Sequence, residues 1–129
     1  MIAGPSLAAY MPQDTAVAAQ KVTAVCTGVG SSRDDPRWLS YPVRLVFANR
    51  SGQFAAGEHL ALDHDGRQMA ALDCDAPWLL LKLPAGRYSV TATLPREPAT
   101  RQQTVAFTTG GAGSQREVGV VFPGLAANQ

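Results

Sequence analysis

The feature that most constrains the fold is a series of short β segments, separated by turn signals, that runs from residue 41 to residue 122. The clearest segment is residues 87–94, in which the apolar side chains from Tyr88 to Leu94 alternate with polar ones. This period of two is typical of a strand with one buried face. Such segments recur about every 8–12 residues, as in β-sandwiches. The sequence therefore predicts an all-β fold, a seven-stranded antiparallel β-sandwich.

Turn chemistry and local composition indicate how neighbouring segments connect. Residues 58–72 predict a hairpin, because Asp-His-Asp-Gly at 63–66 separates two β segments. Residues 77–83 read PWLLLKL and predict a strand buried on both faces. We expect residues 100–108 and 116–122 to pair across the glycine-rich connection between them.

The N-terminal third follows a different pattern. Residues 1–20 are rich in alanine and contain no lysine or arginine, so no convincing signal peptide is evident and they are interpreted as a leader remnant or a mobile arm. Asp35 before Pro36 predicts a short helical turn at the start of residues 36–40, before the first core strand. The predicted division is an N-terminal arm at 1–24, a sandwich domain at 25–122 and a tail at 123–129.

Charge and hydropathy exclude several kinds of partner. The 129 residues carry 11 basic and 10 acidic side chains and a net charge of +1, so electrostatics give no reason to expect nucleic acid as a partner. No apolar run approaches the roughly 18 residues of a membrane span. The chain has the length of one domain.

One cluster carries metal-type ligands. His59, Asp63 and Asp65 share a face of the predicted strand, and a three-ligand metal site is conceivable there, with His64 pointing away. The alternative is that Asp-Gly and its neighbours form the hairpin turn, for which these residue types are favoured. We expect the turn, with the metal site as the competing hypothesis. No other cofactor is predicted.

The two cysteines, Cys26 and Cys74, fit neither a zinc site nor a redox pair by their spacing. One disulfide and two free buried thiols both remain open at this point. Asp73 and Asp75 flank Cys74 and disfavour its thiolate, which argues against a nucleophilic cysteine.

Aromatic and basic side chains are interpreted structurally. We expect the large aromatic residues to fill the sandwich core or its lid, and these are Trp38, Tyr41, Trp78 and Tyr88. The arginines at 44, 87 and 101 are expected to line one solvent-facing surface. No nucleophile elbow or phosphate loop is present in the sequence, so no enzyme activity is predicted.

The segment LLLKLPAGRYSVTATL at 79–94 resembles the L-P-x-G-x-Y-x-V-x-A signature of carboxypeptidase regulatory-like domains. The order of segments over residues 25–122 is also similar to that of a group of small bacterial exported proteins. The resemblance implies a transthyretin-like (prealbumin-like) sandwich that works in the periplasm without catalysis. The transthyretin-like hydrolases end in a Tyr-Arg-Gly-Ser motif, whereas this sequence ends Ala-Ala-Asn-Gln, so their activity is the least favoured alternative.

Beside this family pattern the two cysteines stand out, because they do not look like a family feature and both fall in matching loop regions. A Cys26–Cys74 disulfide explains them together and is expected. The function expected is a binding or accessory module for an unknown protein or glycan of the cell envelope. Edge strands near residues 100–107 and the loops beside residues 63–66 are the predicted contact regions.

Overall fold

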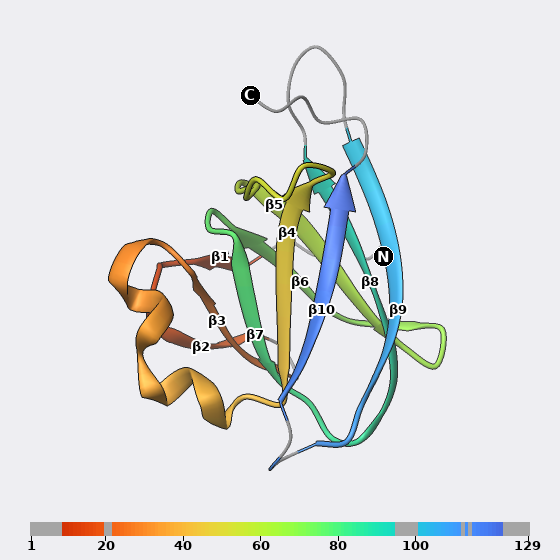
Figure 1. Cartoon of the computed structure of the whole chain (residues 1–129). Helices are drawn as coiled ribbons and strands as arrows, with labels where there is room; N and C mark the ends of the chain where they lie inside the picture. The colour runs from red at the N-terminus through yellow and green to blue at the C-terminus, as the bar shows by residue number, and fades with distance from the viewer. Residues whose placement is uncertain (1–8, 20–21, 95–100, 112, 114, 123–129) are drawn as a thin grey trace.

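Two five-stranded sheets face each other in the computed structural model, which describes residues 9–19, 22–94, 101–111, 113 and 115–122 (Figure 1). Sheet A has the order β1 (Ala9–Met11), β6 (Arg67–Cys74), β5 (Glu58–His64), β8 (Gly86–Leu94) and β9 (Arg101–Thr109). Sheet B has the order β10 (Arg116–Phe122), β4 (Val43–Asn49), β7 (Trp78–Lys82), β3 (Val22–Thr27) and β2 (Ala16–Ala19). The expected all-β fold with two sheets is confirmed.

The core lies between the sheets and follows from the period-two patterns. On β8, Tyr88, Val90, Ala92 and Leu94 are at most 5% exposed, as the alternation predicts. Strand β7 is buried on both faces, because Leu79 and Leu81 join the inter-sheet core while Leu80 packs in a second cluster on the outside of sheet B. The expectation for PWLLLKL is therefore confirmed.

The hairpin of β5 and β6 is also as expected. Its two-residue loop is Asp65-Gly66, with φ of 53° and 77°. Positive φ at both central residues is the requirement of a type I′ turn, for which Asp-Gly is a favoured pair. A register shift between Leu62 and Asp63 interrupts the pairing near the turn.

The count and the direction of the strands differ from the prediction. The described residues contain ten strands rather than seven, and the sheets are not purely antiparallel, because β10 pairs with β4 and β1 pairs with β6 in parallel. The predicted pairing of residues 100–108 with 116–122 is wrong, since β9 lies in sheet A and β10 in sheet B. The backbone N–H of Arg116 donates to the carbonyl of Pro42 at 2.8 Å, so β10 joins β4 from its first residue.

The N-terminal segment contributes strands to both sheets. Strand β2 pairs antiparallel with β3, and β1 lies beside β6. The prediction placed residues 1–24 outside the sandwich, whereas these pairings bring residues 9–11 and 16–19 into it. Residues 1–8 of the expected arm and the expected tail at 123–129 lie outside the described residues.

Two short 3₁₀ turns, η1 (Gly30–Asp34) and η2 (Pro36–Ser40), cover part of the outer face of sheet B. The Asp35 side chain accepts from the backbone N–H of Arg37 at 2.9 Å, which is the N-cap expected before Pro36. Trp38 and Tyr41 are buried against Val25 and Leu80. These turns thus close the second, smaller apolar cluster.

Candidate functional site

The three residues of the metal hypothesis do not come together. His59 and Asp63 are four positions apart on β5, which corresponds to about 13 Å along a strand. The Nδ1 atom of His59 lies 2.7 Å from Oδ1 of Asp73, its cross-strand partner on β6, and Asp65 lies in the hairpin turn. Within the part of the chain that the structure describes, no group of three or more His, Cys, Asp or Glu side chains is placed to hold a metal ion.

His64 belongs to an aromatic stack instead. Its ring lies 4.5 Å from that of Tyr88, which in turn lies 5.9 Å from the ring of Phe107. Nδ1 of His64 is 2.7 Å from the carbonyl oxygen of Arg87. The stack connects the last residue of β5 with β8 and β9.

Tyr88 is held at both ends of its side chain. Its hydroxyl donates to the carbonyl of Pro84 at 2.8 Å. Burial raises the pKa of Tyr88 above its usual value, and the nearby Asp65 carboxylate raises it further. The Tyr88 hydroxyl therefore stays protonated through the neutral range and serves as a donor in the turn before β8.

Cys26 on β3 and Cys74 on β6 form a disulfide, with the two Sγ atoms 2.06 Å apart and the Cα atoms 5.6 Å apart. Both side chains are at most 1% exposed. The expectation that the cysteines lie in loops is wrong, because both occupy core strands. The bridge joins sheet B to sheet A on the side of the sandwich where β1 and β2 are the edge strands.

The four edge strands of the described sheets differ in how they are protected. Strands β1 and β2 have only three and four residues, and β10 carries the charged pair Arg116 and Glu117. Strand β9 has nine residues, pairs with β8 without any register shift, and has a charge only at Arg101. Proteins usually protect sheet edges by shortness, charge, proline or a bulge. Beyond its first residue, β9 has none of these.

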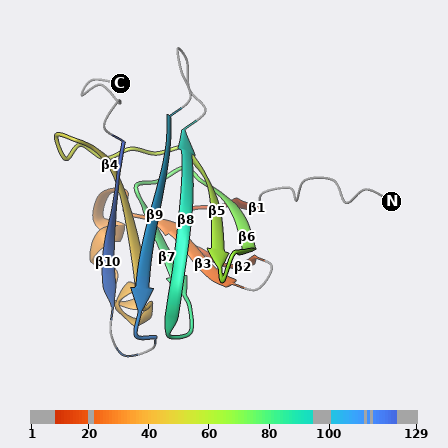
Figure 2. The same ribbon diagram turned by 90° about the vertical axis from the view of Figure 1, so that its right-hand side faces the viewer.

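The outward side chains of β9 are small or polar. Gln102, Thr104, Ala106 and Thr108 are exposed, and the hydroxyls of Thr104 and Thr91 are 3.0 Å apart across the strands. In Figure 2, β9 and β10 border the same side of the sandwich, and they belong to different sheets. We call the side of β9 that faces away from β8 the open edge. The segment near residues 100–107, which was expected to be an edge, thus lies at an edge from residue 101 onward, and residue 100 lies outside the described part.

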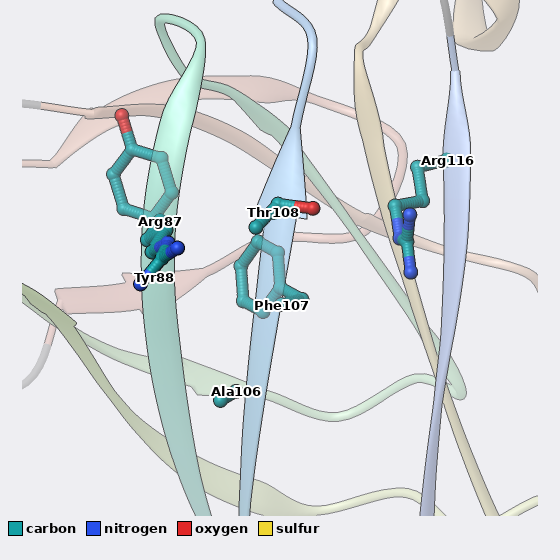
Figure 3. Close-up of a pocket in the computed structure, with 6 residues that line it drawn as sticks. All are labelled: Arg87, Tyr88, Ala106, Phe107, Thr108 and Arg116. Atoms are coloured by element: carbon teal, nitrogen blue, oxygen red, sulfur yellow. The ribbon is translucent and has the colours of Figure 1, made fainter.

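A pocket of about 260 Å³ lies at the C-terminal end of the open edge. Six residues of three strands line this edge pocket (Figure 3): Arg87 and Tyr88 of β8, Ala106, Phe107 and Thr108 of β9, and Arg116 of β10. Tyr88 and Phe107 are 5% exposed and supply an apolar wall. Arg87, Thr108 and Arg116 are exposed and supply donors.

The side chains that line the edge pocket carry a net positive charge. None of its lining residues is acidic, and among the described residues neither Arg87 nor Arg116 forms an ion pair. The neighbouring acid, Glu117, is engaged elsewhere, because it pairs with Arg44. The pocket can therefore bind an anionic group.

The arginines do not share one surface, contrary to expectation. Arg87 lies on β8 of sheet A. Arg44 lies on β4 of sheet B, with its guanidinium 4.5 Å from the ring centre of Trp78. Sequence reasoning missed Arg116, Phe107 and Thr108, because only the placement of β10 beside β4 brings Arg116 near the end of β9. The one signal in the sequence was the alternation that sets Arg87 and Tyr88 on opposite faces.

No family model, curated protein or solved structure matches the chain. Its class is therefore defined by its own structure, as a two-sheet, disulfide-linked all-β sandwich. None of the described residues forms a helix long and apolar enough to cross a membrane.

Proposed function

We propose that this protein is an exported, non-catalytic binding module that receives an extended segment of a partner protein along the open edge of β9. The observation that carries the proposal is the nine-residue, unbulged and almost uncharged edge strand. A segment added there would form backbone hydrogen bonds with β9, as in β-strand addition. The outward side chains of β9 would then contribute to selection of the added segment.

An export location is supported by the disulfide. Bridges such as Cys26–Cys74 persist in oxidising compartments, including the bacterial periplasm, and are rare in the cytosol. The bridge is fully buried, and it links two strands of different sheets. A buried structural bridge of this kind suits a domain that works outside the cytoplasm.

We also propose a transthyretin-like fold of the carboxypeptidase regulatory-like type. The support is the LPAGRY segment, in which the Tyr88 hydroxyl closes the turn by donating to Pro84 while its ring is buried. Such a fold would serve as an accessory domain, and the open edge gives that role a definite surface.

Selection from a displayed library of random dodecapeptides would test the edge. We expect enriched peptides to slow amide hydrogen exchange in β9, because the added strand hydrogen-bonds its outward N–H groups. Enrichment of no peptide would contradict the proposal. So would peptides that protect β10, or the outer face of sheet B, and leave β9 unchanged.

Two neighbouring proline variants separate binding from folding. In an antiparallel strand, successive residues direct their N–H groups to opposite sides, so one of Thr104 and Val105 faces β8 and the other faces the open edge. We expect one of Thr104→Pro and Val105→Pro to unfold easily, and the other to keep its stability and lose the peptide. The matched control is Val121→Pro in β10, which should bind if it folds. A stable β9 variant that still binds the selected peptide would refute the proposal.

A further inference from the structure

We infer that the edge pocket is a carboxylate-binding subsite, which selects extended segments that place an acidic side chain or a C-terminal carboxylate at the end of β9. This inference rests on the proposed function, because it names the chemistry of the segment that the open edge receives. The occupant is a peptide, since the pocket adjoins the last residues of an edge strand, where a peptide backbone is expected to lie.

Two arginines give the edge pocket its charge. Arg87 and Arg116 reach the pocket from β8 and β10, on either side of β9 (Figure 3). Arg37 and Arg44 have carboxylate partners in Asp35 and Glu117, whereas the two pocket arginines have none among the described residues. A guanidinium presents planar donors that match a carboxylate.

The edge pocket is small and has an apolar wall. A volume of about 260 Å³ is smaller than most drug-binding cavities and suits one side chain or a chain terminus. Tyr88 and Phe107 are stacked and buried there, with ring centres 5.9 Å apart. Such a wall excludes water from one side of the bound group and so strengthens its contacts with the arginines. The exposed hydroxyl of Thr108 adds a further donor beside them.

The edge pocket is continuous with the open edge. Ala106, Phe107 and Thr108 belong both to β9 and to the pocket. A strand laid along β9 would therefore end beside the pocket. One carboxylate, that of Asp65 in the β5–β6 turn, would oppose an anion, because it contacts His64, whose ring lies 4.5 Å from that of Tyr88 in the pocket wall. The Asp65 carboxylate lies 3.3 Å from Nε2 of His64.

Three short peptides distinguish the sources of the carboxylate. Acetyl-Thr-Val-Thr-Glu-amide carries only a side-chain carboxylate, acetyl-Thr-Val-Thr-Gln carries only a terminal one, and acetyl-Thr-Val-Thr-Gln-amide carries neither. Each is titrated into ¹⁵N-labelled protein while the Nε–H signals of the arginines and the amide signals of β9 are recorded. We expect at least one charged peptide to shift the Arg87 and Arg116 signals saturably, and to bind about ten-fold more tightly than the neutral peptide.

Variants then assign the site. Arg87→Gln and Arg116→Gln should each lower the affinity for the charged peptide about five-fold and leave the affinity for the neutral peptide unchanged. Arg50→Gln is the matched control, because Arg50 is an exposed arginine of the β4–β5 turn outside the pocket. Asp65→Asn should raise the affinity for the charged peptide about two-fold.

The outcomes separate this inference from the proposed function. Equal affinity of the charged and neutral peptides, with β9 signals shifted, would overturn the carboxylate subsite and leave strand addition intact. Shifts of the arginine signals without any change in the β9 amides would support the subsite and count against strand addition. Equal loss of binding in Arg50→Gln would also overturn the subsite, since general charge attraction would then explain the effect.

Discussion

Removal of the Cys26–Cys74 bridge is the perturbation whose magnitude follows most directly from the structure. The two cysteines are 48 positions apart in the chain, and their bridge joins β3 of sheet B to β6 of sheet A. In the chain-entropy model, cross-linking a loop of this length reduces the entropy of the unfolded chain by an amount worth about 4 kcal/mol at room temperature. Domains of this size are stable by only about 5–15 kcal/mol.

The assay is urea unfolding of the oxidised protein and of the Cys26→Ala/Cys74→Ala double variant. With a urea dependence of about 1.5 kcal/mol per molar, a loss of about 4 kcal/mol lowers the midpoint by about 2.5 M. Loss of the sulfur atoms from the buried sites adds a smaller cost. The matched control is reductant added to the double variant, which should change nothing.

The result that would refute this reasoning is a loss below about 1 kcal/mol. The unfolded chain would then not be restrained by the bridge in the way the model requires. Reductant should also lower the stability of the wild-type protein at equilibrium, because it breaks the same bridge. If reductant has no effect while the double variant loses much of its stability, the loss does not come from the bridge.

Three further changes have expected outcomes. Gly28→Ala should lower the free energy of unfolding, measured in urea, by about 2–4 kcal/mol, because Gly28 has φ of +101° and an added Cβ would lie 2.6 Å from Cγ of Trp78. The control Gly30→Ala, at positive φ in open space, should lower it by only about 1 kcal/mol. Equal losses in the two variants would contradict the steric explanation. Asn49→Ala should lower the free energy of unfolding, measured by heat or urea, by about 1–3 kcal/mol, because the buried Oδ1 accepts from the N–H groups of Ser51 and Gln53 at 3.0 and 2.9 Å. An unchanged stability would show that these hydrogen bonds are dispensable. The unfolding free energy should fall as pH rises above about 10, because Tyr88 then loses its proton in the unfolded chain but, with its raised pKa, keeps it in the folded state. Tyr88→Phe should lessen this fall. An equal fall in both proteins would show that Tyr88 does not cause it.

Local pairing could be predicted from the sequence. The β5–β6 hairpin followed from the Asp65-Gly66 turn, whose residue types suit positive φ. The burial of β7 on both faces followed from its unbroken run of leucines. In each case the signal lies within a few residues and depends on steric preferences of the backbone or on side-chain burial.

Long-range pairing could not be predicted in the same way. Strand β10 pairs with β4, in which Arg44 lies 73 positions before its partner Glu117 in the chain, and no local pattern distinguishes β4 from β9 as the partner of β10. The glycine-rich connection predicts a reversal of the chain, but not the sheet that the returning strand joins. Strand β2 could not be predicted either, because its sequence AVAA has little β propensity and its strand conformation depends on pairing with β3.

The candidate site shows the same division. The contact region near residues 100–107 was predicted from the idea of an edge strand, and β9 does lie at an edge. The pocket combines Arg87, Phe107 and Arg116 from three strands in two sheets, so it exists only after the sandwich has assembled. The metal hypothesis, in contrast, relied on shared strand faces and neglected the strand's rise of about 3.3 Å per residue.

The most direct test of the central claim is residue-resolved amide hydrogen exchange along β9 in the free protein. An open edge predicts alternation from Gln102 to Thr109, in which N–H groups directed to β8 exchange slowly and those between them exchange fast. Uniformly slow exchange would contradict the claim, because both sides of β9 would then already be hydrogen-bonded and no edge would remain for a partner.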